Sequence, residues 1–461
     1  MTAPLQEALR HHQAGRLRDA ARLYQSVLKA HPRNADALHL LGLVAHQEGQ
    51  HARARSLVSR ALKERPGDPR FLNALAAILR AEGQLEEAAA QLREALARSP
   101  KDATVLTNLG LVLQDLGDSA AARAAYDHAL AVEPDQPEAR ANRAIVLLQQ
   151  GHFEEGWREY EWRWRVPGFT TPARRFAAPA WDGTPLSRRT LFVHAEQGLG
   201  SAIQFVRYVC LIKGRGGRVV LECQPPLKRL FAGTFGLAHG SAHGAADGPV
   251  AQVVAKGEGP LPAFDLQAPL MSLPHLLGTT LATIPAAVPY LSAPADACAR
   301  WTERLADAPH PRVGLTWAGN RNHPNDRKRS LAATGLAPLV HAGHASFFSL
   351  QVGQAEGVAA FAPGAVTDLA PALTDFAETA AVIAALDLVI SVDTAVAHLA
   401  GALAKPCWLL LPQPAEWRWL EGRDDSPWYP TFRLFRQRVR GDWTDVVARV
   451  AAALQQFRDA P

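Results

Sequence analysis

The chain contains few of the residues that build disulfide scaffolds. Its 461 residues include only four cysteines, which lie far apart and form no Cys-x-x-Cys pair. Disulfide frameworks and cysteine-based metal sites need closely and regularly spaced cysteines. The pattern therefore predicts reduced, mostly buried thiols and a cytoplasmic protein.

Long hydrophobic runs without charge are also missing. The nearest candidate, residues 380–411, is interrupted by Asp387, Asp393 and Lys405. A membrane-spanning helix needs about 20 consecutive apolar residues, so no transmembrane segment is predicted. The first ten residues lack the apolar core of a signal peptide and enter a helical pattern at once.

Lysine is scarce, because only eight of the 49 basic residues are lysine and the rest are arginine. The formal net charge of +5 is mild for this length, and no basic run is interleaved with aromatic residues. Nucleic-acid binding is therefore not predicted, whereas a phosphate-bearing ligand or an anionic membrane surface would suit the positive charge. With 20% charged and 48% hydrophobic residues, the composition is that of a globular chain of two or three domains.

The first third of the chain has a period of 34 residues. The repeated positions are held by glycine, proline and alanine: Gly15, Gly49, Gly83, Gly117 and Gly151; Pro32, Pro66, Pro100 and Pro134; Ala20, Ala54, Ala88 and Ala122. This spacing resembles the tetratricopeptide repeat, in which each unit is a pair of helices. The resemblance implies that the glycine turns the chain between the helices, the alanine lets them approach, and the proline ends the second helix. Such pairs stack into a helical solenoid with a concave surface.

The concave surface of the array could bind a peptide or a partner protein, or the array could be a spacer or a dimerisation element. No tryptophan occurs before Trp157, so the array lacks the large side chains that dominate many interfaces. Residues 156–164 then gather aromatic and charged side chains on one helix. We interpret this helix as a cap whose aromatic face packs on the next domain, with a ligand-binding box as the alternative. Residues 166–188 are rich in proline and predict a linker.

From Thr190 onward, short apolar strands alternate with helices, which is the pattern of a doubly wound α/β fold. Strands are expected at residues 191–195, 218–223, 312–319, 347–352, 388–392 and 407–411. Residues 233–262 are rich in Gly, Ala and His and predict surface loops. The histidines His239, His243 and His275 have no regular ligand spacing, so no metal site is expected.

The prediction of function depends most on residues 388–406. The first five are a continuous apolar run, typical of a strand buried on both faces of a parallel sheet. Asp393 and Thr394 end this run, and apolar residues at helical spacing follow. A strand, a short polar turn and a helix place backbone N–H groups and the positive end of a helix dipole where phosphate binds. The alternative is an ordinary turn with Asp or Thr as the N-cap.

A second polar loop follows the strand expected at residues 312–319. Residues 321–329 carry four cations within nine residues. Guanidinium and ammonium groups just beyond a strand end suit a diphosphate. A solvated charged loop with no ligand is the alternative.

These motifs together resemble bacterial proteins that join tetratricopeptide repeats to a domain related to glycosyltransferase family 9, the heptosyltransferases. The segments that carry the resemblance are Gly156-Trp157, Glu161–Arg163, Trp181–Gly183, His194–Gly200, Gln204–Tyr208, Trp317–Asn320, Arg329-Ser330, Asp393–Gly401 and Asp424–Pro430. The resemblance implies a GT-B fold of two Rossmann-like α/β halves, here residues 189–309 and 310–461, following a helical array at residues 1–165.

The resemblance also implies a nucleotide-sugar donor that is held mainly by the C-terminal half. Asp393, Thr394, Ala395 and His398 would line its diphosphate and sugar; Asn320, Arg327, Lys328, Arg329 and Ser330 would meet phosphates; Gln351 would lie near the nucleotide. In the N-terminal half, the turn with Gln197, Gly198 and Gly200 would face the acceptor. No metal or cofactor is expected, because cations and helix ends can stabilise a departing diphosphate.

One position departs from the family pattern. After Glu-Gln-Gly-Leu-Gly the family usually has an aspartate, the candidate general base, where this chain has Ser201. A serine hydroxyl cannot take up the acceptor proton at neutral pH unaided. Either Glu196 or His194 replaces the aspartate, or activity is weak, or the domain binds a nucleotide sugar without turnover. Glu196 is the better candidate, since a carboxylate at a strand end can point into the cleft.

Two functional hypotheses follow. The first is a glycosyltransferase whose repeat array presents the acceptor, which could be a protein. The second is a non-catalytic scaffold with a degenerate nucleotide-sugar-binding domain, a hypothesis that Ser201 favours. A Rossmann-type oxidoreductase fits less well, because the turn after Ala195 lacks a third glycine at the required spacing. The sugar, the nucleotide, the acceptor and the formation of a homo-oligomer are left open.

Overall fold

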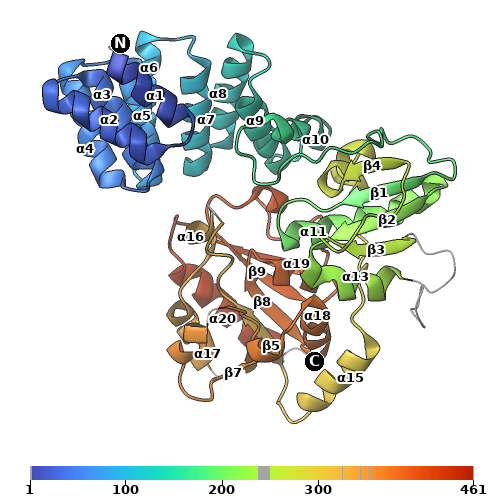
Figure 1. Cartoon of the computed structure of the whole chain (residues 1–461). Helices are drawn as coiled ribbons and strands as arrows, with labels where there is room; N and C mark the ends of the chain where they lie inside the picture. Colours follow the sequence, from blue (N-terminus) through green and yellow to red (C-terminus); the bar gives the residue numbers. More distant parts are fainter. Residues whose placement is uncertain (1–2, 237–249, 324, 343–344, 354, 460–461) are drawn as a thin grey trace. The chain divides into compact units, whose positions relative to one another are not determined.

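The computed structural model describes residues 3–236, 250–323, 325–342, 345–353 and 355–459 (Figure 1). The chain divides into two compact units: unit 1 comprises residues 1–147 and 159–167, and unit 2 comprises residues 148–158 and 168–461. A helical solenoid followed by an α/β region of two Rossmann-like halves was predicted, and it is confirmed. His239 and His243 lie outside the described residues. No helix in the described part of the chain is both long and apolar enough to cross a membrane.

Helical pairs stacked along the chain form the N-terminal repeats (Figure 1). The helices are α1 (Ala3–Gln13), α2 (Leu17–Ala30), α3 (Ala35–Gln47), α4 (His51–Glu64), α5 (Pro69–Ala81), α6 (Leu85–Arg98), α7 (Ala103–Leu116), α8 (Ser119–Val132), α9 (Pro137–Gln149) and α10 (Phe153–Tyr160). The repeat glycines between paired helices have φ between 72° at Gly15 and 86° at Gly117, a backbone region that only glycine enters freely. The repeat alanines are fully buried. Both roles expected from the repeat pattern are therefore confirmed.

One repeat position shows how closely the two helices of a pair approach. A Cβ atom added at Gly42 would lie 2.6 Å from Val58 Cγ2, and one added at Gly110 would overlap the Tyr126 ring. The intervening repeat has Ala76 at this position. The size of the residue here therefore fixes how much of the facing side chain fits between the helices.

The N-terminal half of unit 2 contains a four-stranded parallel sheet in the order β3-β2-β1-β4. Its strands are β1 (Thr190–His194), β2 (Arg218–Cys223), β3 (Gln252–Ala255) and β4 (Leu266–Pro269), and its helices are α11 (Leu199–Phe205), α12 (Val209–Ile212), α13 (Lys228–Phe235) and α14 (Leu273–Leu276). Helix α15 (Ala295–Arg304) follows and packs against α18 (Phe376–Ala385) of the C-terminal half. The prediction of surface loops throughout residues 233–262 is wrong at β3, which pairs with β2 as an edge strand. A four-residue edge strand is too short to show a clear period in sequence.

The C-terminal half contains a six-stranded parallel sheet in the order β10-β9-β8-β5-β6-β7. Its strands are β5 (Arg312–Thr316), β6 (Ser346–Ser349), β7 (Val366–Asp368), β8 (Leu388–Val392), β9 (Cys407–Leu411) and β10 (Phe432–Arg436), and its helices are α16 (Asp326–Arg329), α17 (Ala337–His341), α18 (Phe376–Ala385), α19 (Ala395–Ala402) and α20 (Thr444–Asp459). The strand order reverses direction between β5 and β8. The carboxyl ends of two such strands mark the place where doubly wound sheets bind ligands.

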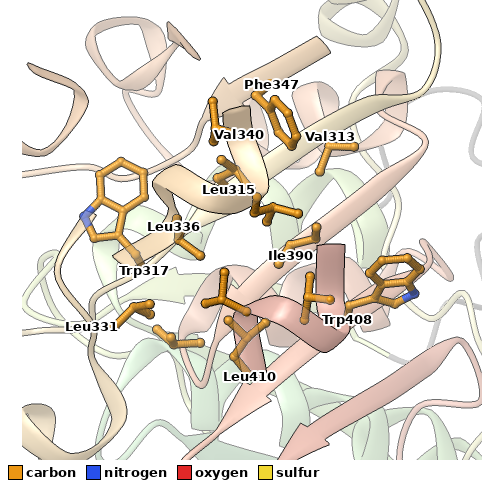
Figure 2. Packing of buried hydrophobic residues seen from close by; sticks show 14 of the residues in the cluster. Val313, Leu315, Trp317, Leu331, Leu336, Val340, Phe347, Ile390, Trp408 and Leu410 are labelled. Atoms are coloured by element: carbon orange, nitrogen blue, oxygen red, sulfur yellow. The ribbon is translucent and has the colours of Figure 1, made fainter. Parts of the chain in front are cut away.

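The two central strands, β5 and β8, are buried along their whole length. Leu315 and Ile390 from these strands pack with Leu410 of β9 and Val340 of α17 (Figure 2). Helix α20 joins the same cluster through Val450. This close-packed layer fixes the backbone from which the loops after β5 and β8 begin.

The first six residues of α10 belong to unit 2 rather than to the repeats. Trp157 is 1% exposed, and its ring centroid lies 5.9 Å from that of Phe205 and 5.3 Å from that of Trp417. Phe153 stacks on Trp428 at 5.9 Å. The helix that ends the repeats thus contributes an aromatic face to the α/β unit, as its sequence predicts.

The remainder of this segment differs from the expected single helix. The α-helix ends at Tyr160, and Glu161–Arg165 forms a 3₁₀ helix within unit 1. Trp162 lies there between the guanidinium groups of Arg140 and Arg165, at 4.5 and 4.3 Å from its ring. The aromatic residues of the fifth repeat are therefore shared between the two units instead of forming one box.

Candidate functional site

The predicted donor turn lies at the carboxyl end of β8. Asp393 follows the strand, Thr394 occupies the N-cap position of α19, and Ala395 is the first residue of that helix. The Thr394 side chain does not cap the helix; its Oγ1 lies 3.1 Å from Ser391 Oγ instead. The first N–H groups of α19 therefore have no side-chain cap, unlike those of an ordinary N-capped turn.

Arg329 links the loop after β5 to this turn. Its Nη1 donates to the Asp393 carbonyl at 2.9 Å, and its Nε donates to Asp326 Oδ1 at 3.3 Å. Gly319 makes room for it, because an added Cβ there would lie 2.5 Å from Arg329 Nη2. The hydroxyl of Ser330 accepts a hydrogen bond from Gly319 N at 3.0 Å. The structure thus brings the predicted residue Arg329 to the base of the donor turn, whereas Ser330 stabilises the loop after β5.

Other predicted phosphate-binding residues lie on the exposed part of the same loop. Asn320, Arg327 and Lys328 are exposed, and Asn320 Oδ1 accepts from Asn322 N at 3.0 Å. Their exposure places these side chains at the solvent-facing surface of the loop.

Gln351, which was expected near the nucleotide, holds the backbone after β5. Its Oε1 accepts from the backbone nitrogens of Trp317 and Ala318 at 3.1 and 3.0 Å. The Gln351 side chain is buried, and its oxygen stabilises the backbone of the loop after β5.

His398 lies one turn into α19 and is buried. Its Nδ1 is 2.9 Å from the Tyr429 hydroxyl, its Nε2 is 3.8 Å from Asp393 Oδ1, and its ring stacks on Trp419 at 5.4 Å. Burial, and then the positive charge of Arg418, keeps the pKa of His398 well below its ordinary value. The imidazole is therefore neutral at neutral pH and can exchange hydrogen bonds without adding charge.

The predicted acceptor turn faces the donor turn. A Cβ added at Gly200 in α11 would lie 2.9 Å from His398 Cδ2 and 3.5 Å from Ala395 Cα. Gln197 has a positive φ of 59°, and Gly198 is the N-cap residue of α11. The turn after β1 and the turn after β8 therefore meet through α11 and α19, although nearly 200 residues separate them.

The two residues predicted to replace the family aspartate are buried side chains with structural partners. Glu196 is 1% exposed, and its Oε1 accepts from Met271 N at 3.1 Å. His194 is 5% exposed, and its Nε2 lies 3.1 Å from Gln267 Oε1. Both side chains contact β4 or the turn that follows it, so their predicted role as proton acceptors gains no support from this geometry.

Arg418, on the loop after β9, is a site residue that the sequence analysis missed. It is buried; its Nη2 donates to Ser201 Oγ at 3.1 Å, and its Nε donates to Gln204 Oε1 at 2.6 Å. Its Nη1 forms an ion pair with Glu416. One guanidinium therefore joins the C-terminal half to the position where the family pattern has aspartate.

Glu416 is the second missed residue. Its Oε2 accepts from Arg418 N at 2.9 Å, and its side chain keeps 32% of its surface exposed. Burial raises the pKa of Glu416 to about 7; Asp393 acts in the same direction and Arg418 opposes the shift. The carboxylate is thus surrounded by protein and still reachable from solvent. The sequence signal was the alternation of charged and aromatic residues from Glu416 to Trp419, in the loop that follows a buried strand.

Family models match both parts of the chain. A model described as tetratricopeptide repeat matches residues 5–69 and 107–160, and a model described as TPR repeat matches residues 76–117. A model of glycosyltransferase family 9 (heptosyltransferase) matches residues 347–409, which include β8, the donor turn and α19.

One curated relative is Protein FlbA of Caulobacter vibrioides, which is 30% identical over 329 residues. These residues are 68% of this chain and 54% of FlbA, so the chain spans about half the length of that relative. Among solved structures, Pseudomonas aeruginosa pilF is 26% identical with a TM-score of 0.33, covering 35% of this chain and 73% of pilF. The TPR protein TTC0263 of Thermus thermophilus is 27% identical with a TM-score of 0.32, covering 34% and 87% of the two chains. The chain thus carries tetratricopeptide repeats in its N-terminal region and a glycosyltransferase family 9 segment in its C-terminal half.

Proposed function

We propose that this protein transfers a sugar from a nucleotide-sugar donor to an acceptor. The observation that carries the proposal is the switch point of the six-stranded sheet, where β5 and β8 end side by side. Asp393, the start of α19 and Arg329 come together there. Nucleotides bind doubly wound sheets at such points, with phosphate at a helix N-terminus. The family 9 match, which includes β8 and α19, supports this assignment.

In the proposed reaction, the C-terminal half stabilises the departing nucleoside diphosphate. The uncapped N–H groups of α19 would donate hydrogen bonds to one phosphate, and the exposed side chains of Arg327 and Lys328 would contact the other. Negative charge develops on the diphosphate as its bond to the sugar breaks, and these groups would stabilise it in the transition state. We propose that these cations suffice without a metal ion or a cofactor.

For the acceptor, we propose that unit 1 binds a protein or peptide on its concave surface. Tetratricopeptide arrays use such surfaces for recognition, which supports the proposal. The cytoplasmic location and the formation of a homo-oligomer stay predictions.

Ligand binding tests the proposal directly. Nucleoside diphosphates and nucleotide sugars are added to the full chain, and the unfolding temperature is measured. A ligand at 100 times its dissociation constant stabilises the folded state by about 2.7 kcal/mol, which is a shift of a few degrees. We expect Asp393→Asn and Arg327→Ala to reduce the shift. Arg438→Ala, an exposed arginine paired with Asp445 at 3.3 Å, is the control. No shift with any nucleotide would contradict the proposal.

The second candidate, a scaffold that binds a nucleotide sugar without turnover, is favoured by Ser201. Its hydroxyl accepts from Arg418 and cannot serve as a base unaided. Release of nucleoside diphosphate from a bound nucleotide sugar separates the two candidates, because a scaffold would bind the donor and release none.

A further inference from the structure

A proton acceptor for glycosyl transfer must lie where the acceptor turn and the donor turn meet. Arg418 reaches both sides of this place: it donates to Ser201 in α11 and pairs with Glu416 on its own loop. The Arg418 guanidinium therefore contacts both the Glu416 carboxylate and Ser201, the position where the family pattern has aspartate.

Glu416 also differs from the other carboxylates of the site in its access to solvent. Its side chain is 32% exposed, whereas that of Asp393 is 11% exposed and Glu196 is almost completely buried. A general base must reach the acceptor hydroxyl within hydrogen-bonding distance. Of these three carboxylates, Glu416 meets that condition best.

The charges around Glu416 suit a group that exchanges protons near neutral pH. Burial, together with the negative charge of Asp393 on the donor turn, raises its pKa to about 7 against the opposing positive charge of Arg418. A base is most effective when its pKa lies near the working pH. His398, on α19, has its pKa held well below the ordinary value and stays neutral in this range.

Arg418 is held firmly enough to orient this carboxylate. Its guanidinium lies 4.4 Å from the Trp417 ring, and its Nε bonds to the buried Gln204. A planar guanidinium with fixed partners fixes the direction of the carboxylate that it contacts.

We propose that Glu416 is the general base of this site and that Arg418 is its positioning residue, an inference that rests on the glycosyl transfer proposed above. The acceptor oxygen attacks the anomeric carbon and forms the new C–O bond. The bond from that carbon to the diphosphate oxygen breaks, and its electron pair leaves with the diphosphate. The acceptor proton passes to the Glu416 carboxylate and from there to solvent.

The test uses the full chain with UDP-, GDP- and ADP-linked hexoses, and measures nucleoside diphosphate released with water as acceptor. Glu416→Gln keeps the size of the side chain and removes the base. It should lower the rate about 10²–10⁴-fold, while the thermal shift with the donor is unchanged. Glu64→Gln is the matched control, because Glu64 is 24% exposed and pairs with Arg33 at 2.9 Å in unit 1. It should leave the rate unchanged.

The pH profile separates a base from a merely structural carboxylate. The wild-type rate should rise as pH increases through about 7, and Glu416→Gln should lose this rise. Arg418→Lys, which keeps the charge but loses the planar fork, should lower the rate and move the profile while keeping the rise. Ser201→Asp combined with Glu416→Gln should recover at least about tenfold of the lost rate, because it restores a carboxylate on the other side of Arg418.

Each unfavourable outcome has a separate meaning. If the wild type turns over a donor and Glu416→Gln keeps its rate and pH profile, the role of Glu416 is refuted while the glycosyltransferase stands. If no nucleotide sugar shifts the unfolding temperature and none is hydrolysed, the proposed function fails. Binding without hydrolysis in the wild type also refutes Glu416 as a base and favours the scaffold.

Discussion

At the scale of single residues, Gly200 shows a use of glycine that its sequence context did not reveal. The resemblance implied only that the turn with Gly198 and Gly200 faces the acceptor. In the structure Gly200 lies in α11, and its missing side chain leaves room for His398 of α19. The residue therefore permits contact between two helices from different halves of unit 2.

Gly200→Ala should weaken this contact. The added methyl group would lie 2.9 Å from His398 Cδ2, too close for a normal carbon contact, and overpacking of this kind costs about 1–3 kcal/mol. Urea unfolding followed by the fluorescence of unit 2 tryptophans measures the loss. Gly198→Ala is the control, because its φ of −87° suits alanine and nothing lies within 4 Å of the added atom. Equal stability of the two variants would contradict the prediction.

His39 offers a pH-dependent prediction in the repeats. Burial, followed by the charge of Arg70, lowers the pKa of His39 to about 4. An unfolded histidine titrates near 6.5, so the unfolded state gains a proton that the folded state cannot bind. The unfolding free energy should therefore be unaffected above pH ~6.5 and fall by about 3 kcal/mol as pH drops from ~6.5 to ~4. Hydrogen exchange of the α3 amides reports this loss.

Asparagine removes the titrating group and is the residue found one repeat later, at Asn73. His39→Asn should flatten the pH dependence of exchange in α3, and His31→Asn, at an exposed position, is the control. A steep dependence that persists in His39→Asn would show that another group is responsible.

Much of the candidate site could be predicted from the sequence because the carboxyl ends of parallel strands meet at one edge of a sheet. Asp393 and Arg329 were both expected there, and they are in contact. Glu416 and Arg418 were missed because their importance depends on contacts with Ser201 and Gln204, more than 200 residues away. The position of Glu196 after a strand did not reveal that its carboxylate accepts a hydrogen bond from Met271 N.

At the scale of elements, the buried central strands were the most predictable. Residues 218–223, 388–392 and 407–411 form strands with the expected bounds. Continuous apolar runs of this kind are long enough to be recognised in the sequence as buried strands. β7 has only three residues, and arginines interrupt the apolar residues of β10. The segment after the acceptor turn consists of two short helices, α11 and α12, separated by a 3₁₀ turn at Val206–Tyr208.

The paired helices of the repeats carry a testable size relation. Gly42 faces Val58 and Gly110 faces Tyr126, while the intermediate repeat has Ala76 and Leu92 at these two positions, and both are buried. The large Tyr126 ring thus faces a glycine, whereas the smaller side chain of Leu92 leaves room for an alanine.

Gly110→Ala should destabilise the α7–α8 pair by about 1–3 kcal/mol, because the new methyl group overlaps the Tyr126 ring. The double variant Gly110→Ala/Tyr126→Leu recreates the pair found in the preceding repeat and should lose less than the two single variants together. Urea unfolding followed by circular dichroism measures the coupling, which should exceed about 0.5 kcal/mol. Additive effects would show that the two positions do not share one space.

At the scale of the whole molecule, the boundary of the α/β unit is the main difference from the sequence-based division. The sequence placed the repeats at residues 1–165, whereas residues 148–158 belong to unit 2 in the structure. The repeat period continues to Gly151, and the aromatic residues that begin at Trp157 were the signal for packing on the next domain. They did not show that the change of unit begins as early as residue 148.

A pair of fragments tests this division. Residues 148–461 keep Phe153 and Trp157, which pack on Phe205, Trp417 and Trp428. Residues 168–461 lack both, and losing the burial of two large side chains should cost about 3–6 kcal/mol. The shorter fragment should therefore unfold at a lower temperature and bind a hydrophobic dye. Similar behaviour of the two fragments would contradict the assignment of residues 148–158.

The contact between Gly200 and His398 also limits how this architecture can be recombined. The N-terminal half has a glycine where a side chain would collide with the His398 ring of the C-terminal half. The two halves are therefore complementary in shape and cannot be exchanged independently. A chimera that joined the N-terminal half of this chain to the C-terminal half of a relative would have to transfer these two positions together. Protein engineers who exchange halves to change donor preference should therefore keep Gly200 and His398 together or replace both.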